Sequence, residues 1–182
     1  MLNKKISLLR VTVFSIILII FFITVNGLRK AEFESKNTLK SVVGNSLFKI
    51  QDNFKLIQAS QMELTLEVIE QFNEKLLVIK AYADTVDLAL SPNRLLNPIV
   101  KNMLAILRSI ETSYTINLKF TEDDNIKYQA LLEHIKTLLP LITKVYYDPA
   151  SIEGAETTLK INNKDSLILY NDELSQYVSE LD

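Results

Sequence analysis

One apolar stripe, running from Leu39 to Leu90, constrains the fold of this chain more than any other feature. Its members recur at steps of three and four residues, the spacing that places side chains on one face of a helix. They are Val43, Leu47, Ile50, Phe54, Ile57, Leu64, Val68, Phe72, Leu76, Ile79, Ala83, Val86 and Leu90. A stripe of this length is typical of a helix packed against other helices. We therefore expect one long helix from residue 30 to residue 90, with Gly44 and residues 58–61 as the only places for a kink or a fold back.

Capping residues and prolines divide the next part of the chain into shorter helices. Asn97-Pro98 places a capping side chain before a proline suited to the first helical turn, so we expect a helix from Pro98 to about Ile116. Thr121, followed by three acidic residues, predicts the start of another helix. Asp148-Pro149 predicts its end.

The last segment fits two kinds of secondary structure. Alternating apolar residues predict a small β-hairpin near 157–170, whereas the spacing of Leu167, Tyr170 and Leu174 also fits a helix. We favour the hairpin followed by a final helix from about Asn171. The predicted fold class is mainly all-α: an N-terminal transmembrane helix that continues into a long helix, within an elongated helical bundle or coiled coil.

A run without charges near the N-terminus predicts a membrane anchor. Thirteen of the 18 residues from Val11 to Leu28 are Val, Ile, Leu or Phe, and as a helix they would cover about 27 Å. Because Arg10 can extend its charge to the lipid headgroups, we place the lipid-contacting span at residues 6–28. The alternative is a cleaved signal peptide, since a basic start precedes the run and small residues lie near its end.

The domain plan is an anchor over residues 1–28 and a helical bundle over 29–182. We expect a single-pass protein of the inner (cytoplasmic) membrane of a bacterium, with its short basic tail inside and the bulk of the chain outside. Lys outnumbers Arg 16 to 4, which favours a bacterial source. Residues 122–182 carry 5 Lys and Arg against 12 Asp and Glu, a net charge of −7. An acidic C-terminal part disfavours binding to nucleic acid.

Composition removes most catalytic chemistry. There is no Cys, and the single His134 cannot form a site that needs two imidazoles. Three glycines are too few for the usual phosphate-binding loops or nucleophile turns. We therefore predict no catalytic, cofactor-binding or metal-binding residues, no cofactor and no enzyme activity.

The best candidate site is a stripe of four carboxylates, Glu63, Glu67, Glu70 and Glu74, at steps of four, three and four residues. It is interpreted as a solvated face or as partner-selecting positions beside the apolar stripe; docking of a basic helix and cation binding are the other interpretations. Gln61, the one polar residue in the apolar stripe, either fixes register with a partner or marks a break in the helix.

The function that these patterns favour is binding to another protein, as a scaffold or assembly component, with a helical protein or a second copy as partner. The alternative is an extracytoplasmic sensing module in which a small molecule binds between helices and a separate partner carries the signal. The general layout resembles the outer region of bacterial transmembrane receptors, and that resemblance implies the second function.

Overall fold

The computed structural model describes residues 2–60, 63–90, 94–148 and 157–181, with side chains from residue 18 onward. Within these residues it contains five α-helices and no β-strand, which confirms the mainly α prediction. The helices are α1 (Leu2–Ala59), α2 (Leu66–Leu90), α3 (Leu96–Asn117), α4 (Glu122–Tyr146) and α5 (Lys164–Ser179). The chain divides into two compact units, Met1–Leu39 and Lys40–Asp182, and α1 contributes to both.

The first unit is helical throughout its described residues, and from Leu18 onward its apolar side chains other than Val25 are exposed. Six consecutive residues, Leu18 to Ile23, are each more than half exposed, from 52% for Leu18 to 67% for Phe21. Farther along, the Lys36 ammonium lies 2.7 Å from a Glu32 carboxylate oxygen, one helical turn away. Such pairs stabilise an exposed helix by a few tenths of a kcal/mol.

The predicted transmembrane span, residues 6–28, falls within α1. Residues 6–17 belong to α1, but their side chains lie outside the described residues. Over the side chains that are described, no helix meets the length and apolarity needed to cross a membrane.

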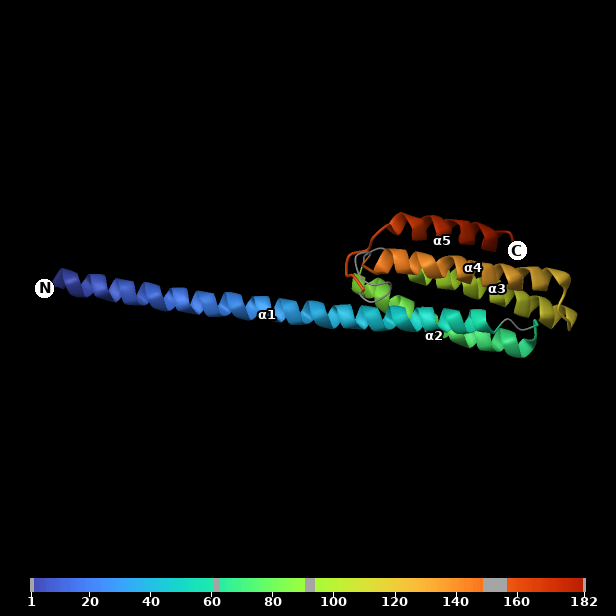
Figure 1. The fold of residues 1–182 in the computed structure, drawn as a ribbon, viewed down its shortest axis with the longest axis horizontal. Helices are drawn as coiled ribbons and strands as arrows, with labels where there is room; N and C mark the ends of the chain where they lie inside the picture. The colour runs from blue at the N-terminus through green and yellow to red at the C-terminus, as the bar shows by residue number, and fades with distance from the viewer. Residues whose placement is uncertain (1, 61–62, 91–93, 149–156, 182) are drawn as a thin grey trace. The chain divides into compact units, whose positions relative to one another are not determined.

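The second unit is a bundle built around one core, and the apolar stripe of the sequence supplies one side of it. Every member of the stripe from Val43 to Val86 is at most 7% exposed. The stripe belongs to two helices, however, because α1 ends at Ala59 and α2 begins at Leu66. The predicted single helix from 30 to 90 is therefore wrong: the chain folds back between Ala59 and Leu66, a connection that overlaps the expected break at 58–61 (Figure 1).

Local hydrogen bonds mark both sides of this break. The Ser60 hydroxyl donates to the Ile57 carbonyl oxygen at 2.7 Å, which satisfies an acceptor at the end of α1. The Thr65 hydroxyl oxygen accepts from the Val68 backbone N–H at 3.3 Å, as a capping residue does at the first turn of a helix. Gln61 itself lies outside the described residues, so its proposed role in register stays a prediction.

Three further helices complete the bundle. Helix α3 packs against α2, α4 and α5, and α5 also packs along α4 (Figure 1). Helix α4 lies beside the C-terminal part of α1, since the Gln51 amide donates to the Thr143 hydroxyl at 3.1 Å. The prediction for the start of α4 is confirmed: Thr121 caps a helix that begins at Glu122.

The β-hairpin predicted near 157–170 is wrong. Residues 157–170 contain only one isolated antiparallel bridge, from Thr157 to Tyr147, and α5 already begins at Lys164, earlier than the predicted Asn171. The backbone N–H groups of Thr158 and Asn162 bond to carbonyl oxygens of Tyr146 and Val145 at 2.9 and 3.0 Å. This segment therefore donates hydrogen bonds to the last carbonyl oxygens of α4 and does not form a hairpin.

Candidate partner-binding face

The outer face of α2 is the best candidate site, and it begins with three of the predicted carboxylates. Glu67, Glu70 and Glu74 are all exposed and share this face. Glu63 is also exposed, but it precedes the helix, so the structure does not extend the stripe through it as one helical face. Gln61, the fifth predicted residue, lies outside the described residues.

The same spacing continues beyond the carboxylates into apolar residues. Leu77, Ala81 and Leu88 follow Glu74 at steps of three, four and seven residues, and Val78 lies beside them. Leu77 is 49% exposed, Val78 44% and Leu88 73%, and Ala81 is also exposed. We call Glu67, Glu70, Glu74, Leu77, Val78, Ala81 and Leu88 together the α2 outer face.

This face is free because the opposite side of α2 supplies the core. The buried residues are Val68, Ile69, Phe72, Leu76, Ile79, Ala83, Val86 and Asp87. On the outer face, the Gln71 amide donates to a Glu67 carboxylate oxygen at 3.3 Å. Between described residues, no ion pair joins a Lys or Arg to Glu67, Glu70 or Glu74. The three carboxylates are therefore not paired with a cation within the described parts of the chain.

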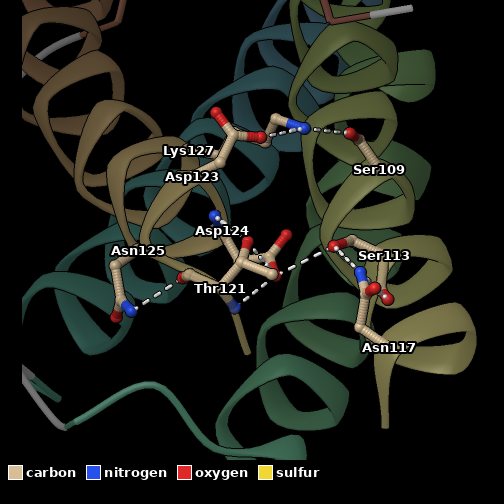
Figure 2. A network of polar contacts seen from close by, with 8 residues as sticks. All are labelled: Ser109, Ser113, Asn117, Thr121, Asp123, Asp124, Asn125 and Lys127. Carbon is tan, nitrogen blue, oxygen red and sulfur yellow. Dashed lines mark hydrogen bonds and ion pairs between the residues drawn. The ribbon is translucent and has the colours of Figure 1, made fainter. Parts of the chain in front are cut away.

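A second polar cluster lies where α3 meets α4, and its bonds show a structural role (Figure 2). The Asp124 Oδ2 atom accepts hydrogen bonds from the Thr121 N–H at 2.7 Å, the Thr121 hydroxyl at 2.8 Å and the Ser113 hydroxyl at 2.9 Å. The Asp124 N–H donates back to the Thr121 hydroxyl oxygen at 3.1 Å, which completes a capping box. Burial alone would raise the pKa of Asp124, but these hydrogen bonds and the charge of Lys127 lower it.

Lys127 belongs to the same cluster. Its ammonium group lies 2.8 Å from an Asp123 carboxylate oxygen and donates to the Ser109 hydroxyl at 3.0 Å (Figure 2). Only 11% of the Lys127 side chain is exposed, so its charge is used inside the fold. The cluster joins α3 to α4, and the second Asp124 carboxylate oxygen, Oδ1, is buried without a hydrogen-bond partner among the described residues.

Asp87 forms a third buried polar group, at the start of α3. Its carboxylate accepts from the backbone N–H groups of Leu95, Leu96 and Asn97 at 3.0, 3.1 and 2.8 Å. Asp87 of α2 thus caps α3, because Leu95 at the capping position makes no side-chain cap bond. This corrects the predicted start at Pro98: the helix begins at Leu96.

Burial raises the pKa of Asp87, and the charge of Asp84 raises it further. The three backbone hydrogen bonds lower it, but burial has the larger effect. The Asn97 amide donates to a carboxylate oxygen of Asp84, so it does not cap its own helix. Tyr146 is 1% exposed, and burial raises the pKa of its hydroxyl, with the Asp87 charge adding to the effect. The hydrogen bonds of Asp87 and Asn97 join α2 to the start of α3, whereas the buried Tyr146 hydroxyl has no hydrogen-bond partner within the described parts of the chain.

His134 packs between two aromatic rings. The ring centroids of Tyr170 and Tyr177 lie 5.9 and 5.5 Å from the imidazole centroid. Burial lowers the pKa of His134, opposed by the charge of Glu173. The Tyr170 hydroxyl donates to the His134 backbone carbonyl at 2.8 Å. This hydrogen bond and the ring contacts join α5 to α4.

Within the described parts of the chain, no three His, Cys, Asp or Glu side chains lie where they could jointly hold a metal ion. No protein-family model, curated protein or solved structure matches this chain. The α2 outer face combines carboxylates that form no ion pair among the described residues with exposed apolar side chains along one helix.

Proposed function

We propose that this chain is a single-pass, membrane-anchored helical protein that acts by binding another protein through the α2 outer face. The observation that carries this proposal is the exposure of Leu77, Val78 and Leu88 on a helix whose other side already supplies the core. An apolar strip bordered by charges is the usual composition of a protein-binding surface.

The anchor is supported by the first unit. Six consecutive apolar residues, Leu18 to Ile23, point around all sides of a helix and are more than half exposed. A helix that is apolar all round requires a protein core or lipid around it. With the basic residues before it on the cytoplasmic side, this segment would place the bundle outside the inner membrane.

Photocrosslinking in living cells tests the binding face. Replacing Leu77 or Leu88 with a photoreactive amino acid is expected to give one discrete crosslinked product of higher mass. Lys136 on α4, whose side chain is 69% exposed, is the matched control position and should give no such product. Absence of a product at 77 and 88, or equal yield at 136, would overturn the proposal.

The anchor has a separate test. Membranes washed with alkaline carbonate should retain the protein, and the mass of the retained chain should include residues 1–28. Release of the whole chain into the wash would refute the anchor, and a mass lacking residues 1–28 would favour the cleaved signal peptide. Neither result depends on the α2 outer face.

A second function, sensing of a small molecule, has its own observation. A groove between α1 and α4 is lined by Gln51, Lys55, Leu139, Pro140, Thr143 and Lys144. Its two ammonium groups favour a small anion such as a carboxylate or phosphate ester. Saturable thermal stabilisation by such a compound, lost in Lys55→Ala, would support sensing; a screen with no stabilising compound would oppose it.

A further inference from the structure

We infer that α3 and α5 together form a face that pairs with the same face of a second copy of this chain, about a two-fold axis parallel to the helices. This inference goes beyond the proposed function and does not involve the α2 outer face. It follows from the opposite charges of the two helices, from their positions along a common direction and from the pairings that a two-fold axis allows.

The exposed charges along α3 and α5 have opposite sign. Three exposed cations repeat at steps of seven residues, the first of them just before α3: Arg94, Lys101 and Arg108. Four exposed acids and one exposed cation lie on α5 and its C-terminal cap: Asp165, Asp172, Glu173, Glu180 and Lys164. Between described residues, no ion pair joins any of the three cations to an acid. A basic row therefore lies beside an acidic row, and we call the two rows together the α3–α5 face.

The two rows are level with each other along the helix direction. Helices α3 and α5 run parallel, because one hollow between them is lined by Arg94, Ile168 and Asn171 and a second by Arg108, Val178 and Leu181. Between these hollows, the Asn102 amide donates to the Asn171 side-chain oxygen at 3.2 Å. Each helix rises about 1.5 Å per residue, so Lys101 is level with Asp172 to within about one turn. By the same offset, Arg94 is level with Asp165, and Arg108 with Glu180.

A two-fold axis parallel to the helices makes use of both features. Rotation about an axis above the groove between α3 and α5 places the basic row of each copy over the acidic row of the other. A closed symmetric dimer allows no shift along its axis, so residues that are level within one copy face each other between copies. Lys101 then meets Asp172 of the second copy, and the symmetry repeats this contact.

Other arrangements bring like charges together. A two-fold axis across the helices would place each row over its own counterpart, where equal charges repel. An anionic lipid surface, or a partner of one charge sign, would attract one row and repel the other. A second copy carries both rows, and it is the occupant that these charges fit.

The middle of the α3–α5 face is apolar. Ile168, which is 38% exposed, and the half-buried Ala105 and Val178 line the groove, close to the axis, where residues meet their own counterparts. Helix α5 has 16 residues, so a face two helices wide covers about 500 Å² per copy. Two copies would bury about 1,000 Å², the lower limit for a specific interface. The charge pairs should therefore decide whether the dimer forms.

Disulfide formation in isolated membranes tests the pairing, since the chain has no Cys of its own. In the full-length protein, Ile168→Cys places a thiol close to the axis and should give a disulfide-linked dimer on mild oxidation. Lys136→Cys on α4, where the native side chain is 69% exposed, is the matched control and should give little dimer. No dimer at position 168, or an equal yield at position 136, would overturn the inference.

Charge reversal in the Ile168→Cys protein tests which residues face each other. Lys101→Glu or Asp172→Lys alone should lower the dimer yield about tenfold, because each change reverses two symmetric contacts at once. The two reversals in one chain should return the yield to within about twofold of the parent, since opposite charges again face each other. Lys136→Glu is the matched charge control and should leave the yield unchanged.

The recovery in the double variant separates pairing from a loss of fold. Both native side chains are exposed, so their reversal should leave the far-UV circular dichroism unchanged. Single reversals without effect, or a double variant without recovery, would overturn the inference. A loss with Lys101→Glu but not with Asp172→Lys would assign the basic row to an acidic partner instead, which also overturns it. Each of these outcomes leaves the proposed function standing, because the crosslinking positions on α2 are unaltered.

Discussion

The carboxylate of Asp87 should be the most sensitive single group in the bundle. It is 2% exposed and accepts three backbone N–H bonds at the start of α3. The donors belong to Leu95, Leu96 and Asn97, which are themselves at most 5% exposed, so water cannot replace the lost acceptor. Asp87→Ala would leave three buried donors unsatisfied at once.

The magnitude follows from these three bonds. Each buried donor without a partner costs about 1–3 kcal/mol. Removing the carboxylate also removes the cost of burying its charge, which offsets part of this loss. We expect a net loss of about 3–5 kcal/mol in the free energy of unfolding. Asp87→Asn should cost less, because its carbonyl oxygen can still accept from Leu95 and Leu96, and no buried charge remains.

Urea unfolding of the full-length protein in neutral detergent, followed by far-UV circular dichroism, measures both variants. With a urea dependence of about 2 kcal/mol per M, Asp87→Ala should lower the midpoint by roughly 2 M. A shift for Asp87→Ala no larger than that of Asp87→Asn would refute the capping argument, since the alanine variant alone removes every acceptor.

The pH dependence supplies an independent check. Because the folded state raises the pKa of Asp87, the folded protein binds this proton more tightly than the unfolded chain. The resulting stability is fully present below the unfolded value of 3.8 and is lost as the pH rises through the folded value. The parent should therefore gain stability relative to Asp87→Asn between pH 7 and pH 4, and a relative loss would contradict the sign.

Three further predictions concern the α3–α4 junction. Asp124→Asn should show the opposite pH dependence, because the lowered pKa of Asp124 gives the parent stability that is present above pH 3.8 and lost on acidification. If the free energy of unfolding falls equally with acidification in variant and parent, the prediction is contradicted. Thr121→Ala removes the capping box and should cost about 1–2 kcal/mol in urea unfolding, whereas Thr121→Ser should retain most of it. Leu118 has a φ of 55° and is 80% exposed. Because glycine adopts this left-handed conformation without strain, Leu118→Gly should raise the free energy of unfolding by about 0.5–1 kcal/mol. The melting temperature should rise in Leu118→Gly and not in Leu118→Ala.

The core residues of α1 and α2 could be predicted from the sequence, whereas their division into two helices could not. Helical spacing identifies the buried face whether the helix is continuous or folds back, because the same side chains pack against neighbours in both cases. The decisive residues are Ser60 and Thr65, whose hydroxyls bond to the backbone at the two helix ends. Threonine before an apolar run is an N-terminal signal, but the stripe continues on both sides of Thr65 and does not show where one helix ends and the next begins.

The start of α3 is capped by a residue of the preceding helix, so it could not be predicted from the residues next to it. Asn97-Pro98 suggested a cap within the segment, yet the acceptor is Asp87, which precedes the first donor by eight residues. Asn97 instead contacts Asp84. Local capping rules describe side chains within a few residues of a helix end, so a cap supplied by the preceding helix becomes visible only in three dimensions.

The hairpin prediction failed because alternation and helical spacing compete over short segments. Leu167, Tyr170 and Leu174 fit the helix, and all three are buried against α3 and α4. Asn163, with a φ of 45°, starts the helix directly after a segment that bonds to the end of α4. Packing on an existing bundle therefore decided between two structures that the local sequence leaves nearly equal.

The candidate face required both kinds of information. Spacing in the sequence identified the carboxylates, but it could not assign a role to Leu77, Ala81 and Leu88, since apolar residues in a helix ordinarily belong to its core. Only the fold separates the two faces of α2 and leaves these three exposed while Leu76 and Ile79 are fully buried. Leu77, Ala81 and Leu88 do not repeat the core spacing in full, because Asp84 occupies the position between Ala81 and Leu88. Their assignment to a partner is therefore a proposal that rests on exposure in the fold, which spacing alone does not give.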